Sequence, residues 1–163
     1  MLQARTQTGG RDPSRMWMVV GSLAGLALAF GLSGTGPRLP GPDWLPVAVG
    51  LAVIAAGTAL RYWSVHTLGR FFTVNVGVAE GQRVVDSGPY ALLRHPSYTG
   101  MLVVYLGVGI ALDSWPSVAA AVVLPTLAVL NRIEHEETML REELAPAYEG
   151  YQRRTKRLVP GVW

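Results

Sequence analysis

The 163-residue sequence contains no cysteine, which excludes disulfide bonds, thiolate nucleophiles and cysteine-ligated metal centres. Charged residues are also scarce: they make up 15% of the chain, whereas a soluble domain usually carries about 25%. Half of the residues are hydrophobic, and the mean hydropathy is +0.28. The missing charge indicates that much of the surface faces something other than water.

The sequence also lacks the signatures of soluble nucleotide-binding and metallohydrolase sites. It has no G-x-G-x-x-G after a predicted strand, no P-loop and no H-E-x-x-H. His66 and His135 stand without the companions that a metal site needs, so we interpret both as structural and expect no bound metal. Any cofactor must then be held by short loops and by the ends of helices.

What the chain does contain is four apolar segments, and a membrane span needs roughly 20 mostly apolar residues. The predicted spans cover residues 16–32, 44–63, 97–112 and 115–131. A hairpin buried in a soluble protein is the competing interpretation of the last two, which are short and joined by a tight turn. Four such segments in so short a chain favour the membrane.

The first segment also resembles a signal peptide, because arginines precede it. However, residues 34–37 are a poor match to a cleavage site and three more apolar segments follow, so we interpret it as a retained helix. Residues 1–15 are expected to form a disordered basic tail, and residues 16–163 a single membrane domain.

Basic residues are distributed unevenly along this predicted topology. With four spans, both termini and the loop 61–94 share one side of the membrane, and that side carries all of the 14 basic residues except Arg38. The positive-inside rule places that side in the cytoplasm. The sequence pI near 9.6 is explained by this topology, with attraction to anionic membrane lipid as an addition. No nucleic-acid partner is needed.

Polar residues collect in two segments on that side. The first, residues 61–94, contains a β-like stretch at 73–78 and leads into Arg94-His95-Pro96-Ser97-Tyr98 at the entry to the third span. Pro96 suits the first turn of a helix, where its missing N–H costs nothing. Taken singly, each of these residues is more typical of a structural role, such as an interfacial anchor, a helix cap or an aromatic belt, than of a functional site.

The second polar segment continues the fourth span. Arg132 and Glu136 lie four residues apart on one helical face and can pair. Charged residues at that depth are costly unless they are paired or used. The other polar residues fit a solvated helix extension or interfacial anchoring: Glu134, His135, Glu142, Tyr148 and Tyr151.

Together these residues resemble a known family. Residues 87–100 read S-G-P-Y-A-L-L-R-H-P-S-Y-T-G and are followed, after a helical hairpin, by Arg132-x-x-x-Glu136-Glu137 and a Y-x-x-Y pair. This pattern is similar to that of the isoprenylcysteine carboxyl methyltransferases and their bacterial relatives over residues 61–160. The R-H-P-S-Y-x-G element is fairly specific, and R-x-x-x-E-E at a hairpin's distance strengthens it.

The resemblance implies an all-α membrane protein of about four transmembrane helices, in which a cytoplasmic loop and the C-terminal tail form a pocket for S-adenosylmethionine. Both termini are then cytoplasmic, in a bacterial inner membrane. The implied cofactor-binding residues are Gln82, Arg83, Val84, Val85, Tyr90, His95, Pro96, Ser97, Tyr98 and Glu136.

The resemblance also implies that Arg132 and Arg94 are the catalytic residues, which hold the carboxylate of the methyl acceptor. An arginine donates two parallel hydrogen bonds to a carboxylate, and an anionic acceptor needs no strong base. The expected acceptor is a lipophilic small molecule or a prenylcysteine-like compound in the membrane.

Other functions remain open from the sequence. Transfer to a phospholipid amine or a thiol is one, although two arginines near the acceptor favour a carboxylate. An NADPH-dependent enzyme similar to sterol reductases is another, against which the R-x-x-x-E-E element and the short chain speak. The third is a non-catalytic membrane protein that has retained the cofactor pocket without its activity. The sequence indicates neither the identity of the acceptor nor the oligomeric state.

Overall fold

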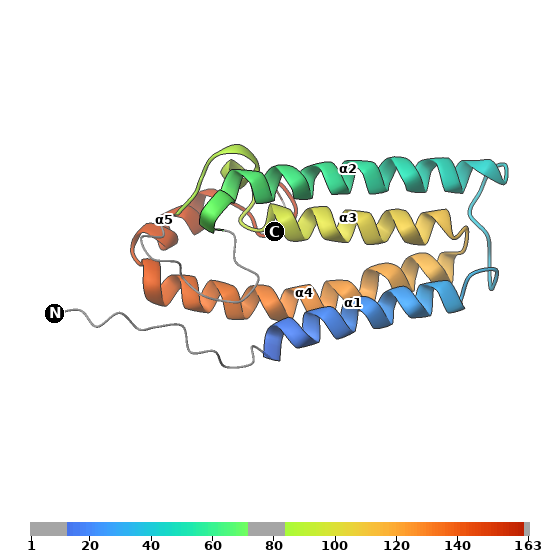
Figure 1. Ribbon diagram of the computed structural model, residues 1–163, viewed down its shortest axis with the longest axis horizontal. Helices are drawn as coiled ribbons and strands as arrows, with labels where there is room; N and C mark the ends of the chain where they lie inside the picture. The colour runs from blue at the N-terminus through green and yellow to red at the C-terminus, as the bar shows by residue number, and fades with distance from the viewer. Residues whose placement is uncertain (1–12, 72–83, 162–163) are drawn as a thin grey trace.

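The computed structural model describes residues 13–71 and 84–161. Within these ranges the chain forms four long helices, α1 (Pro13–Gly31), α2 (Trp44–Leu68), α3 (Pro96–Ala111) and α4 (Trp115–Leu144) (Figure 1). Two 3-10 turns, η1 (Gly69–Phe71) and η2 (Gly88–Ala91), and the short helix α5 (Ala147–Arg154) complete the secondary structure. The β-like stretch predicted at 73–78 lies outside the described residues.

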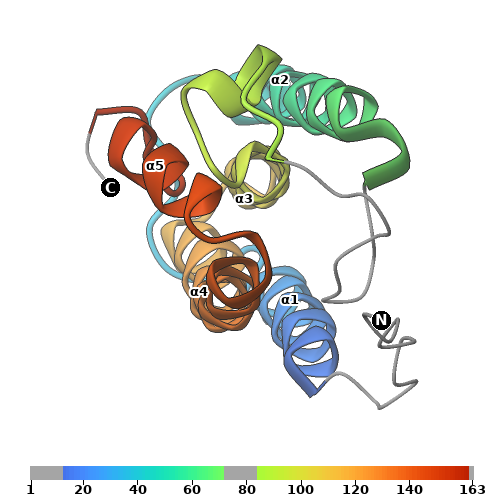
Figure 2. The same ribbon diagram turned by 90° about the vertical axis from the view of Figure 1, so that its left-hand side faces the viewer.

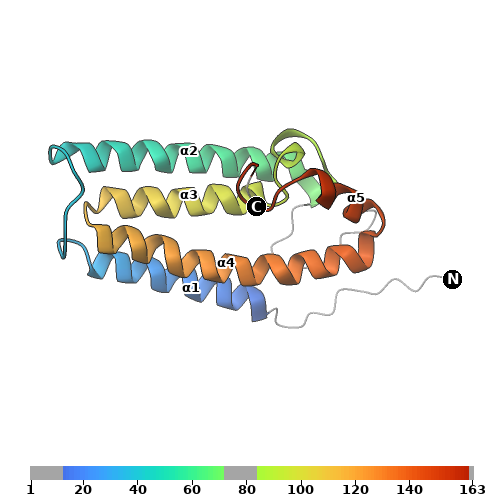
Figure 3. The same cartoon turned by 180° about the vertical axis from the view of Figure 1, so that it is seen from behind.

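The four long helices are arranged in the order α2, α3, α4, α1 when the bundle is seen end-on (Figure 2). Helix α3 packs against both α2 and α4, and α1 packs against α4. The α3–α4 hairpin closes through Asp113, whose φ of 52° is a left-handed conformation that aspartate tolerates. Seen from behind, the connection from α1 to α2 crosses the end of the bundle opposite to α5 (Figure 3).

In the part of the chain that the structure describes, three helices, α1, α2 and α4, are long and apolar enough to cross a membrane. Helix α3 is apolar but has only 16 residues, or about 24 Å at the usual rise per residue, so its crossing stays a prediction. Large apolar side chains such as Trp17, Leu23 and Leu51 are exposed on the outer faces of α1 and α2. Such a surface suits lipid, and the chain is an integral membrane protein.

The observed helices extend beyond the predicted spans at the polar side. Helix α1 begins at Pro13, α2 continues to Leu68, and α4 continues from the apolar part, which ends at Leu130, to Leu144. The apolar pattern marks only the part of a helix that lies in lipid, so it does not reveal where the helix itself ends. Pro146, directly after the last turn of α4, separates it from α5.

Paired glycines allow α2 and α3 to approach each other closely. A Cβ atom on Gly57 would lie 2.7 Å from the carbonyl oxygen of Gly100, and one on Gly100 would lie 2.7 Å from that of Gly57. Gly50 and Gly107 repeat this relation at 2.6 and 2.7 Å. Because the opposing atoms belong to the backbone, neither helix can accommodate a side chain at these points. Small residues of this kind are the usual means of close helix packing in membranes.

We expect Gly57→Ala to lower the stability of the fold by about 1–3 kcal/mol, the usual cost of overpacking. The matched control is Gly31→Ala, since a Cβ atom on Gly31 meets nothing within 4 Å. Thermal unfolding in detergent checks the pair, with a lower midpoint for Gly57→Ala alone. Equal midpoints for the two variants would contradict the close approach.

Candidate functional site

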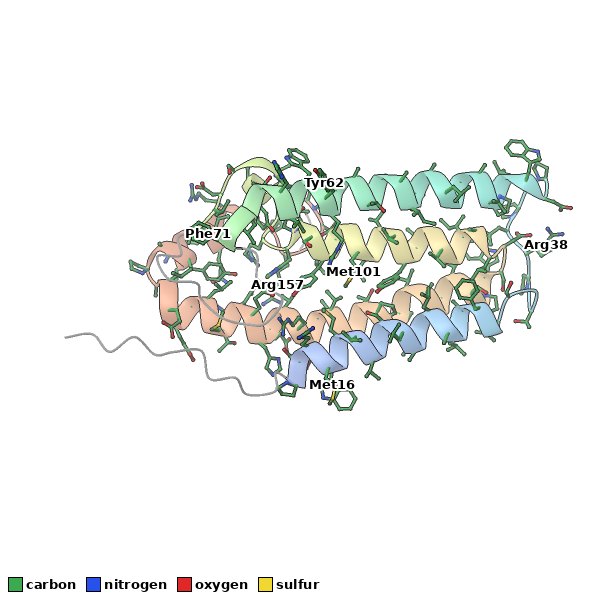
Figure 4. All side chains as sticks on the ribbon, viewed as in Figure 1. Met16, Arg38, Tyr62, Phe71, Met101 and Arg157 are labelled. Atoms are coloured by element: carbon green, nitrogen blue, oxygen red, sulfur yellow. The ribbon has the colours of Figure 1, made fainter. Side chains whose placement is uncertain are left out.

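Polar side chains gather at one end of the bundle, here called the polar end: the last turns of α2, the first turn of α3, residues 131–144 of α4, and α5 with the residues after it. Figure 4 shows Phe71 and Arg157 toward this end and Arg38 at the opposite one. The sequence separates these elements widely, so the fold is what brings them together.

Glu137 lies two turns beyond the apolar part of α4, and its side chain has no exposed surface. Its Oε1 accepts a hydrogen bond from Nε of Arg94 at 2.8 Å and lies 3.3 Å from Nε2 of His95. Both partners belong to the R-H-P-S-Y motif, residues 94–98. A carboxylate at this depth therefore ties α4 to the start of α3.

The second oxygen of Glu137 is surrounded by donors from α4 and from the C-terminal tail, which here means α5 and the residues after it. It lies 3.1 Å from Nη2 of Arg141, 3.3 Å from Nε2 of Gln152 and 3.0 Å from Nη2 of Arg157. Charge-assisted hydrogen bonds of this kind are stronger than neutral ones. The tail is thus held against the same carboxylate as the motif.

These partners also decide the protonation state of Glu137. Burial alone would raise the pKa of this carboxyl, but hydrogen bonds from His95 and Arg94, and their charges, lower it to about 2. Glu137 is therefore ionised at physiological pH. Its negative charge offsets the positive charges of Arg94, Arg141 and Arg157 around it.

Backbone hydrogen bonds lay the tail along the motif. The amides of Arg94 and His95 donate to the carbonyl oxygens of Lys156 and Arg157 at 2.7 and 3.1 Å, and Lys156 N–H donates to Leu92 at 3.2 Å. These bonds form an isolated parallel bridge beside the start of α3. The motif and the tail therefore share one rigid backbone framework.

A second cluster of polar side chains centres on Tyr98. Its hydroxyl donates to Oε2 of Glu136 at 2.9 Å and accepts from Nε of Arg132 at 3.3 Å. Arg132 is only 2% exposed, and its Nη1 donates to the hydroxyl of Ser14 at 2.8 Å. The carboxylate and the guanidinium that the sequence places on one helical face are joined here through a tyrosine of the motif.

Arg61, in the last turns of α2, is not among the site residues that the sequence predicts. Its Nη1 donates to the carbonyl oxygen and to the hydroxyl of Ser97, both at 3.2 Å. The charge of Arg61 also acts on Tyr90. Burial raises the pKa of the Tyr90 hydroxyl, the charge of Glu136 raises it further, and the charge of Arg61 lowers it. A charged residue at the end of an apolar span is the signal that could have identified it.

Most of the predicted site residues meet at the polar end. Pro96 occupies the first turn of α3 as expected, and Val84 and Val85 are half-buried ahead of η2. Gln82 and Arg83 lie outside the described residues. The predicted residues that the structure brings together are Tyr90, Arg94, His95, Pro96, Ser97, Tyr98, Arg132 and Glu136.

Arg94 forms hydrogen bonds with other parts of the protein. Its Nε binds Glu137, and its Nη1 donates to the backbone carbonyl oxygens of Gln152 and Thr155. These contacts hold the tail, so a role for Arg94 at the acceptor stays a prediction. Glu137 itself carries this framework, although the sequence suggests no role for it beyond its place in the motif.

Among the described residues, no group of three or more His, Asp or Glu side chains could hold a metal ion. The polar end brings together the carboxylate of Glu136, the buried guanidinium of Arg132 and the hydroxyl of Tyr98. Such a set can bind a ligand that carries both an ammonium and a carboxylate group.

We expect Glu137→Gln to destabilise the protein by about 3 kcal/mol or more, since Arg94, Arg141 and Arg157 lose the buried negative charge with which they pair. The control, Glu142→Gln, removes an exposed carboxylate from the same helix. Because the pKa of Glu137 is lowered, its contribution is complete above the ordinary glutamate pKa of about 4.3 and is lost as the pH falls toward 2. Thermal unfolding should show a gap between the variants that narrows only in acid; no gap at neutral pH would refute this role.

Comparisons with known proteins identify the family of this chain. A model of the isoprenylcysteine carboxyl methyltransferase family matches residues 48–142. Protein-S-isoprenylcysteine O-methyltransferase B of Arabidopsis thaliana is 32% identical over 121 residues, which cover 73% of this chain and 61% of the relative. A probable protein-S-isoprenylcysteine O-methyltransferase of Oryza sativa subsp. indica is 29% identical over 121 residues, covering 73% of this chain and 63% of that protein. The chain thus spans just over three fifths of the length of these relatives.

A solved structure has a similar fold. The structure of the eukaryotic intramembrane Ras methyltransferase, described as an isoprenylcysteine carboxyl methyltransferase, matches with a TM-score of 0.72 and 26% sequence identity. The match covers 94% of this chain and 54% of that one. The family model runs from α2 to the polar part of α4 and so includes Arg61, the R-H-P-S-Y motif and Glu137. The chain belongs to the isoprenylcysteine carboxyl methyltransferase family.

Proposed function

We propose that the protein is a methyltransferase that uses S-adenosylmethionine to methylate a carboxylate on a lipophilic acceptor. The observation that carries this proposal is the cluster of Tyr98, Glu136 and Arg132 beside the R-H-P-S-Y motif, at one end of a membrane bundle of this family. Relatives named as isoprenylcysteine O-methyltransferases support it.

The residues present fit the amino-acid part of S-adenosylmethionine, which carries an ammonium and a carboxylate group. Glu136 offers a carboxylate to an ammonium group, and it is only partly buried. The hydroxyl of Tyr148 is buried and has no hydrogen-bond partner among the described residues. The Tyr148 hydroxyl is therefore available to form a hydrogen bond with a ligand. In the proposal, the cofactor is held by the set expected from the sequence: Gln82, Arg83, Val84, Val85, Tyr90, His95, Pro96, Ser97, Tyr98 and Glu136.

When bound, S-adenosylmethionine supplies a methyl group that its sulfonium already activates. The remaining tasks for the protein are to position the acceptor and to exclude water. Arg132 is placed to bind the acceptor's carboxylate, because the bonds to Tyr98 and Ser14 fix the plane of its guanidinium. In this proposal Arg94 also positions the site, because it binds Glu137 and the backbone of the tail.

We place the protein in a bacterial inner membrane, with the polar end and both termini on the cytoplasmic side. Helix α3 is then a fourth span. The opposite end supports this orientation, since its single arginine, Arg38, is paired with Asp43 and Asp113. Residues 16–163 then form one membrane domain behind a basic tail. A lipophilic acceptor, such as a prenylcysteine-like compound, reaches the site from the bilayer.

The other functions considered from the sequence are less favoured. An amine or thiol acceptor has no carboxylate at its reacting group for Arg132 to bind. NADPH-dependent reduction finds no support among the matched relatives. The family relation argues instead for a carboxyl methyltransferase.

Glu136→Gln should weaken the binding of S-adenosylhomocysteine by about tenfold or more, because a charge-assisted hydrogen bond to the ammonium group is lost. Calorimetric titration of the detergent-purified protein measures this, with NADPH as the parallel ligand. Glu134→Gln, an exposed neighbour on α4, is the control and should bind like the wild type. Unchanged affinity of Glu136→Gln would remove this residue from the site.

Arg132→Ala should leave the affinity for S-adenosylhomocysteine within about twofold of wild type while abolishing methylation of a carboxylate acceptor, because in the proposal the guanidinium binds the acceptor and not the cofactor. Affinity and turnover are measured on the same preparation. A parallel loss of both would show that Arg132 acts through the framework around Tyr98 and Glu136.

A further inference from the structure

Two tyrosines of α5, one turn apart, differ in how their hydroxyls are used. Tyr148 and Tyr151 are each 3% exposed, and their ring centroids are 6.0 Å apart. The hydroxyl of Tyr151 donates to the carbonyl oxygens of Tyr90 and Leu93, at 2.8 and 3.1 Å. The hydroxyl of Tyr148 is equally buried but makes no hydrogen bond to any described residue.

An unpaired hydroxyl in a buried position reduces stability, and folded proteins leave few such groups unsatisfied. A phenylalanine would fill the same space as Tyr148 without that cost. The fold therefore gives no reason for the oxygen atom, and a ligand that completes its hydrogen bonding would.

The surroundings of Tyr148 indicate which ligand group this is. Burial raises the pKa of its hydroxyl, the carboxylates of Glu137 and Glu136 raise it further, and Arg94 lowers it. The hydroxyl is thus neutral and lies within electrostatic reach of both carboxylates. Glu137 is already saturated by the motif, by Arg141 of α4 and by the tail, whereas Glu136 belongs to the proposed cofactor set.

We infer that the Tyr148 hydroxyl binds the amino-acid end of the S-adenosyl ligand, beside Glu136. This inference rests on the proposed function. A neutral phenol accepts a hydrogen bond from an ammonium group and donates one to a carboxylate, and this end of the ligand carries both. The C-terminal tail then contributes a direct contact to the cofactor, in addition to the framework that Glu137 supports.

The test compares Tyr148→Phe with wild type for two ligands by calorimetric titration of the detergent-purified full chain. S-adenosylhomocysteine carries the amino-acid end, and 5′-methylthioadenosine has the same nucleoside without it. We expect Tyr148→Phe to bind S-adenosylhomocysteine about 5- to 10-fold more weakly, the effect of one lost hydrogen bond. Its affinity for 5′-methylthioadenosine should not change.

Thermal unfolding without ligand provides the second measurement. Tyr148→Phe should be as stable as wild type or more so, because it removes an unsatisfied group. The matched control, Tyr151→Phe, leaves the carbonyl oxygens of Tyr90 and Leu93 without their donor and should unfold at a lower temperature.

Four results would overturn the inference. Lower ligand-free stability of Tyr148→Phe with unchanged ligand affinity would show that the hydroxyl serves the fold. Equal weakening of both ligands would indicate a distorted pocket. If Glu136→Gln weakens S-adenosylhomocysteine binding and Tyr148→Phe does not, the inference fails and the proposed function stands. If the wild type binds neither ligand, the proposed function fails, and this inference with it.

Discussion

A carboxylate without exposed surface must be neutralised from every side, and at Glu137 the donors come from three parts of the chain. Arg94 and His95 approach from the start of α3, Arg141 from the same helix, and Gln152 and Arg157 from the tail. Loss of any one partner leaves a buried charge that its neighbours balance poorly, so the three parts are fixed in one arrangement. The position of the R-H-P-S-Y motif relative to α4, and hence the cluster around Tyr98, follows from this constraint.

Inside the membrane the constraint is of another kind. Lipid provides no hydrophobic drive for helix association, so α2 and α3 are held by close backbone contact at Gly57 and Gly100. That contact places Arg61 beside the first turn of α3, where it binds Ser97. Packing in the apolar part of the bundle and charge at the polar end thus act on the same structural element, the start of α3. A change in either is expected to reach the candidate site.

The sequence predicts the helices well, because apolar runs mark them directly, and the motif identifies the family, which the comparisons confirm. It could not separate Glu136 from Glu137. Adjacent residues on a helix point about 100° apart, and only tertiary packing decides which of them meets the tail. The same limit applies to Arg94, whose partner lies more than 40 residues away in sequence, and to Tyr148, whose hydroxyl differs from that of Tyr151 only in its surroundings.

The function proposed for the polar end is the transfer of a methyl group to a carboxylate. The most direct measurement incubates the purified protein with methyl-labelled S-adenosylmethionine and an S-prenylated cysteine that has a free carboxyl group, followed by base treatment of the lipophilic product. A methyl ester is cleaved by base, so we predict labelled product whose label is released as methanol. No labelled product, or label that resists base as an N-methyl or S-methyl group does, would contradict the account.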